Sequence, residues 1–119
     1  MSTGTAHVWR AGEGEVSLVP LSAVREGDFV LGRVFDQLSW LVVVRKITMA
    51  QEAPVMMHSV FGARFLPGVA IVWDGKVVAV ESVCPCEFVH APLICHLVVD
   101  KAHAFVMVDN VLVSPLKGR

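Results

Sequence analysis

The amino-acid sequence predicts an all-β domain, a compact fold of about ten short strands and hairpins. The apolar residues are rich in valine and other β-branched types, which favour strands. Repeats at helical spacing are hard to find, and short apolar runs alternate with turn residues. We expect strands at residues 6–9, 15–19, 29–33, 39–48, 55–60, 69–73, 76–80, 94–99, 103–108 and 111–114.

Two hairpins are predicted by their turn residues. Asp74-Gly75 lies between two apolar runs, and this dipeptide is typical of a two-residue type I′ turn. Asp109-Asn110 occupies the same position between the last two predicted strands, and both residues tolerate a positive φ. The segment 20–24 opens with proline and could form one helical turn, which the Gly27-Asp28 corner would then break.

Length and composition restrict the class of protein. The 119 residues suit one domain, residues 1–119, with 55% hydrophobic and 18% charged residues. A net charge of −1 gives no reason to expect a nucleic-acid or anionic membrane partner. The first residues lack the profile of a signal peptide, so we expect a cytoplasmic protein or a piece of a longer one. We expect no cofactor. The surface has few polar residues, so another protein, another copy or flanking parts of a longer chain could cover part of it, and an oligomer is possible.

The cysteines allow a metal site but do not favour one. Cys84, Cys86, Cys95 and His96 are ligand types suited to Zn²⁺, yet a Cys-x-Cys spacing differs from usual zinc pairs. Three cysteines are an odd number, which argues against a disulfide framework. We expect buried apolar cysteines and no metal. A nucleophilic pair of a cysteine with His90, His96 or His103 has no signature beyond composition.

Several segments follow one another in a distinctive order. They are residues 1–8, the stretch 19–30 with the Gly27-Asp28 corner, the strand 65–71 followed by 73–76, and the two stretches 94–103 and 108–113. Together they resemble the Hint domain, the fold shared by hedgehog autoprocessing domains and inteins. The resemblance spans nearly the whole chain, and it implies a Hint-like fold related to self-cleaving and protein-splicing domains.

The residues that perform the chemistry of that family are missing. A Hint domain begins with a nucleophilic Cys or Ser, and this position falls on Met1, whose thioether cannot form a thioester by this route. The family's Thr and His, which polarise the scissile amide and move its proton, fall on Leu66 and Val69. The His-Asn pair that ends an intein falls on Ser114-Pro115.

We therefore expect a catalytically inactive or attenuated Hint-like domain that acts as a structural or binding module, not an enzyme. One alternative is an active self-cleaving domain that uses other residues. His58, read with Val55 as a degraded Thr-x-x-His, or His103 could then move the proton, although a structural role is expected for His103. Ser2 would be an ordinary terminal residue. A further alternative is an unrelated small β-barrel interaction or assembly module.

Overall fold

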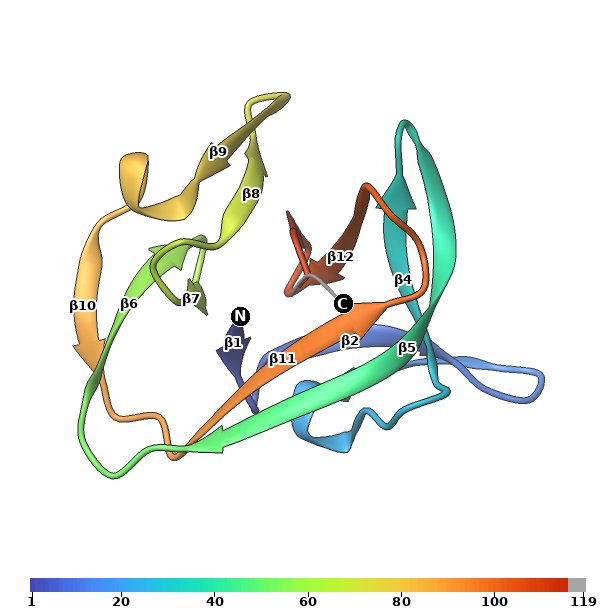
Figure 1. Cartoon of the computed structure of the whole chain (residues 1–119), viewed down its shortest axis with the longest axis horizontal. Coiled ribbons are helices and arrows are strands. Elements are labelled where there is room, and N and C mark those ends of the chain that lie inside the picture. Colours follow the sequence, from blue (N-terminus) through green and yellow to red (C-terminus); the bar gives the residue numbers. More distant parts are fainter. Residues whose placement is uncertain (116–119) are drawn as a thin grey trace.

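The computed structural model describes residues 1–115 and is built of β-strands and two short 3₁₀ helices, with no α-helix among those residues (Figure 1). The last four residues of the predicted domain span, 1–119, lie outside the described part. The elements in order are β1 (Ser2–Thr3), β2 (His7–Ala11), β3 (Val16–Pro20), η1 (Leu21–Ala23), β4 (Phe29–Val34), β5 (Gln37–Ala50), β6 (Val55–Val60), β7 (Ala63–Phe65), β8 (Ala70–Trp73), β9 (Lys76–Ala79), η2 (Val80–Ser82), β10 (Cys86–Val89), β11 (Leu93–Val99), β12 (Ala104–Val108) and β13 (Val111–Val113).

The long strand β5 connects two halves of a continuous antiparallel sheet. Its first residues pair with β4, and its remainder pairs with β11 across a bulge between Val98 and Val99. Figure 1 shows β5 and β11 side by side, and in the pairing order they join the half that contains β10, β6, β7 and β1 to the half that contains β4, β12, β13, β8 and β9. The strand order is β10-β6-β7-β1-β11-β5-β4-β12-β13-β8-β9, and β2 also pairs with β4 and carries β3 at its other edge. The short strand β1 thus lies between β11 and β7, at the middle of the first half.

The predicted turns are confirmed. Asp74 and Gly75 have φ values of 49° and 75°, and Asp109 and Asn110 have 48° and 64°, as a type I′ hairpin requires. At the corner, Gly27 has a φ of 91°, and the backbone N–H of Arg25 donates to the Asp28 carboxylate at 2.9 Å. The proline-led segment forms the single 3₁₀ turn η1.

All ten expected strands are present, but three short ones were not predicted. They are β1, β7 and β10, with two to four residues each. Such short segments carry too little periodicity to be recognised, and they become strands only because distant residues complete their hydrogen bonds, as Cys95 does for Ser2. Strand β5 also extends beyond its expected range, to 14 residues.

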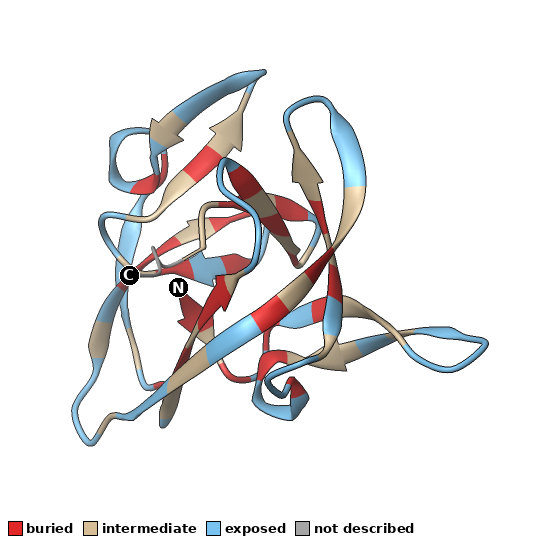
Figure 2. Ribbon diagram, turned by 45° about the vertical axis from the view of Figure 1, so that its right-hand side comes forward, coloured by how far each residue is buried: buried red, intermediate tan, exposed pale blue. Residues whose placement is uncertain are grey.

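The core lies where the two halves of the sheet meet. Figure 2 shows buried residues gathered in the centre of the molecule and exposed residues at the hairpin tips. Val8, Leu41, Phe65 and Val106 are fully buried members of one large cluster, and a smaller cluster forms around Met57 and Ile94. No helix in the described part of the chain is long and apolar enough to cross a membrane.

Candidate functional site

The start of the chain lies inside the sheet. Met1 is 2% exposed and Ser2 is fully buried, because β1 pairs with β11 on one side and with β7 on the other. The Met1 carbonyl accepts a hydrogen bond from the Leu66 backbone N–H at 3.1 Å, and the Ser2 hydroxyl donates to the Arg64 carbonyl at 2.6 Å. Two of the positions expected from the Hint resemblance, Met1 and Leu66, are therefore in direct backbone contact.

The other end of the described chain reaches the same place. Val113 of β13 pairs with Ile71 of β8, and the Ser114 N–H donates to the Ala70 carbonyl at 2.8 Å. Val69 directly precedes β8 and follows the loop that begins at Leu66. The segment 66–71 is thus bordered by the first residue of the chain on one side and by Ser114 on the other.

The side chains at Leu66 and Val69 serve packing. Leu66 packs against the small cluster around Met57 and Ile94, and Val69 packs against the main core. Neither side chain has a hydrogen-bonding group, and within residues 1–115 the backbone N–H of Leu66 polarises the Met1 carbonyl. The site can bind a carbonyl oxygen, but Leu66 and Val69 cannot accept or deliver a proton.

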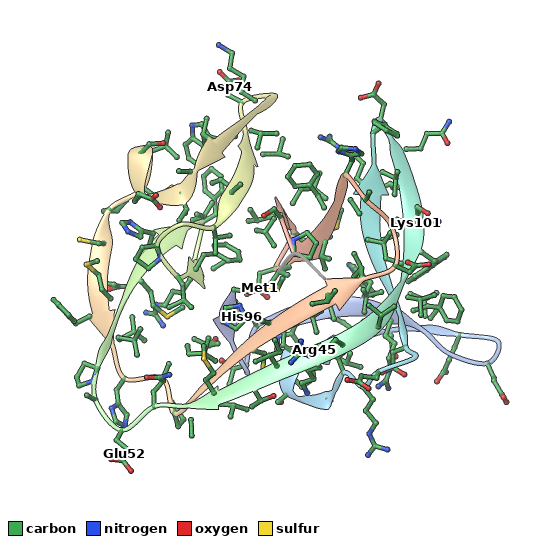
Figure 3. All side chains as sticks on the ribbon, viewed as in Figure 1. Met1, Arg45, Glu52, Asp74, His96 and Lys101 are labelled. Atoms are coloured by element: carbon green, nitrogen blue, oxygen red, sulfur yellow. The ribbon has the colours of Figure 1, made fainter. Side chains whose placement is uncertain are left out.

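His96 contacts the N-terminal nitrogen, which was not expected from the sequence. Nδ1 of His96 lies 2.8 Å from the nitrogen of Met1 and Nε2 lies 3.4 Å away, and Figure 3 shows the two residues together at the centre of the molecule. When the ring proton is on Nε2, the amine N–H donates to Nδ1. The sequence suggests His96 only as a weak zinc ligand or as the partner of a nucleophilic cysteine; the signal that points to this contact is a polar residue within the apolar run 94–99.

Burial keeps both partners of this contact uncharged at neutral pH. Loss of solvent lowers the pKa of the Met1 amine from 8.0 to about 5. Loss of solvent, and then repulsion by the amine, lowers the pKa of His96 from 6.5 to about 4. The neighbouring Cys95 is fully buried and burial raises the pKa of its thiol, so the sulfur stays protonated and is a poor nucleophile.

The candidate zinc ligands do not gather into a metal site. Cys84 and Cys95 are buried, Cys86 is exposed in β10, and His96 faces the Met1 nitrogen. Across residues 1–115 no three His, Cys, Asp or Glu side chains lie close enough to hold an ion. Cys84 and Cys95 therefore belong to the packed interior, and Cys86 belongs to the surface.

The two histidines considered for proton transfer lie in other surroundings. His58 is buried in β6, and its Nδ1–H donates to the Cys84 carbonyl at 3.0 Å. His103 is exposed in the turn before β12 with a φ of 59°, and its ring lies 5.8 Å from that of Phe35. The Met1 nitrogen has His96 beside it instead.

A shallow pocket of about 270 Å³ lies beside β1, and Thr3, Thr5, Arg64 and His90 are among its lining residues. Several of its polar groups already have partners. The hydroxyls of Thr3 and Thr5 are 3.1 Å apart, and the Arg64 guanidinium donates to Glu87 at 2.9 Å. The pocket therefore offers few unsatisfied groups with which to select a ligand.

No known protein family matches the chain, and no curated protein matches it in sequence. The function therefore has to be inferred from the geometry of the strands around Met1.

Proposed function

We propose that this chain is a Hint-like domain that has lost its self-processing chemistry and acts as a structural or binding module. The observation that carries the proposal is that the segment 66–71 holds Met1 at Leu66 and Ser114 at Ala70. A self-processing domain has to bring its two ends together where acyl transfer occurs. Here Met1 and Ser114 are both bound to the segment 66–71, but the side chains of Met1, Leu66 and Val69 are inert.

The contacts at Met1 support a structural role in which no acyl transfer takes place. The Leu66 N–H binds the Met1 carbonyl oxygen, and the partly buried side chains of Leu66 and Val69 pack against the two apolar clusters. Acyl transfer needs a nucleophile and a proton carrier in addition to this polarised carbonyl. Met1 supplies a thioether in place of the nucleophile, and packing groups occupy the positions of the two polar side chains.

His96 favours a second candidate function, which is residual self-processing with a displaced proton donor. Its Nδ1, 2.8 Å from the Met1 nitrogen, is within reach of the atom that would leave if a bond before Met1 were cleaved. The low pKa of His96, about 4, leaves the ring mostly unprotonated at neutral pH, which weakens it as an acid. The missing nucleophile makes this candidate the weaker of the two.

A reporter fusion tests the proposal. A small folded reporter is joined ahead of Met1 in three forms: the unchanged chain, Met1→Cys, and Met1→Cys with Leu66→Thr and Val69→His. Intact mass spectrometry with and without added thiol then measures release of the reporter, and Met1→Ala serves as the control without a nucleophile. We expect no release from the unchanged chain, little from Met1→Cys, and more from the triple variant.

Each result has a definite meaning. Efficient thiol-dependent release from Met1→Cys alone would show a competent site that merely lacks its sulfur, and the proposal of a disabled site would fail. Spontaneous release from the unchanged chain would establish the second candidate, and His96→Gln should then abolish it. If the correctly folded triple variant released no reporter, the Hint-like assignment would fail, and an unrelated interaction module would be favoured.

A further inference from the structure

One face of the sheet is apolar and faces solvent. Strands β3, β2, β4 and β5 lie side by side in that order, and the residues that point inward from them, such as Val8, Val30 and Leu41, are fully buried. The alternate residues point outward. We call their surface the outer face, and its main members are Trp9, Leu18, Phe29, Leu31, Leu38 and Trp40.

The pairing register brings these side chains into contiguous rows. Trp9 pairs with Leu18, and Leu31 pairs with Trp40, which places large apolar groups next to one another across the sheet. Leu18, Phe29 and Leu38 are 51%, 46% and 65% exposed. A strand with one face in water normally alternates apolar and polar residues, whereas the outward positions of these strands are mostly apolar. Such a contiguous patch marks an interaction site.

We propose that the outer face is the interface of a homodimer, in which a second copy of this chain packs its own outer face against the first. The proposal does not depend on the loss of self-processing, because it concerns strands away from Met1. The two sheets would stack as the layers of a β-sandwich do, with their apolar side chains interdigitated. A twofold axis through the face would pair each patch with itself.

The area and the charge of the face favour a second copy as its occupant. With the neighbouring valines, the exposed side chains offer on the order of 600 Å² per copy, close to the roughly 800 Å² per partner of a standard interface. The principal outward residues carry no charge, so two copies can meet without like charges opposing each other. The nearest charged residue, Arg33, lies at the margin, where it pairs with Leu38 and Phe105.

A free strand edge lies at the margin of the face. Among residues 1–115, strand β3 pairs with β2 alone, so its other edge leaves backbone groups open next to the apolar face.

Sedimentation velocity tests the dimer on the full chain at loading concentrations from about 1 to 100 µM, which covers dissociation constants in the micromolar range and below. We expect twice the monomer mass at the upper concentrations. The variants Leu18→Glu and Phe29→Glu each place an unpaired carboxylate in the apolar contact. They should raise the dissociation constant by about 100-fold or more.

The matched control is Phe88→Glu, which places the same charge on a 76% exposed phenylalanine of β10, far from the outer face in the strand order. It should leave the dimer intact, and circular dichroism shows whether each variant keeps its fold. The variant Trp73→Phe leaves Trp9 and Trp40, which lie on the outer face, as its tryptophans. Their fluorescence emission should shift to longer wavelength when dilution separates the dimer and exposes them to water. A wild type that stays monomeric throughout, or a dimer unaffected by both face variants, would overturn the proposal.

Discussion

The contact between Met1 and His96 predicts a fold that loses stability in mild acid. Both groups have pKa values below their ordinary ones, at about 5 for the amine and about 4 for the imidazole. Between the folded and the ordinary pKa values the unfolded chain binds more protons than the folded chain, so falling pH favours unfolding. This contribution is complete above about pH 8 and is lost progressively as the pH falls from about 8 to about 4.

The expected magnitude follows from these values. A change of one pKa unit corresponds to about 1.4 kcal/mol, so the amine alone would contribute at most about 4 kcal/mol. Solvent screening at the half-buried His96, and the fact that the two groups titrate as a coupled pair, reduce the total. We expect the free energy of unfolding to fall by about 2–3 kcal/mol between pH 8.5 and pH 5 through this pair.

Urea unfolding at several pH values measures this loss. His96→Gln keeps a hydrogen-bonding side chain but removes one titrating group, so its stability should depend less on pH than that of the wild type. His7→Gln, at an exposed position in β2, is the matched control and should keep the wild-type dependence. NMR titration of the ring nitrogens gives the pKa of His96 directly, and a value near 6.5 would refute the reasoning.

Three further outcomes are expected. Gly32→Ala should lower the free energy of unfolding by about 1–3 kcal/mol, measured in urea, because a Cβ there would collide with the Phe105 carbonyl of β12; an unchanged stability would contradict the close approach of β4 and β12. Asp28→Ala should cost about 1 kcal/mol because the Arg25 N–H loses its acceptor, and Asp28→Asn, which keeps an acceptor oxygen, should cost less. In the native protein only Cys86 should react quickly with iodoacetamide, whereas all three cysteines should react in urea, as mass spectrometry would show; rapid labelling of a second thiol would mean that the core opens readily.

Much of the fold could be predicted because its signals are local. The turn at Asp74-Gly75 needs only residues that tolerate a positive φ, and the Asp28 carboxylate reaches an N–H three residues away. Ten strands carry enough β-branched residues or adjoining turn signals to be recognised individually, whereas the four residues of β10 include one β-branched residue, Val89. Strands β1 and β7 could not be predicted, since two or three residues are too few to show the apolar–polar alternation of a strand.

The candidate site was only partly predictable. The resemblance to the Hint domain pointed to Met1, Leu66 and Val69, and the structure places Met1 and Leu66 in backbone contact. It did not point to His96, because the contact joins residues 95 positions apart in the sequence. Whether a histidine in an apolar strand meets a partner depends on which strand lies beside it.

The sequence by itself determined the β-rich character, the turns and the absence of reactive side chains at Met1, Leu66 and Val69. These properties belong to single residues or to neighbours along the chain. Only the tertiary structure decided that Met1 is enclosed between β11 and β7, that its amine faces His96, and that the outward residues of β2 to β5 form one apolar face. The reason is that burial, pKa and a shared face depend on strand pairing and register, which distant parts of the chain establish together.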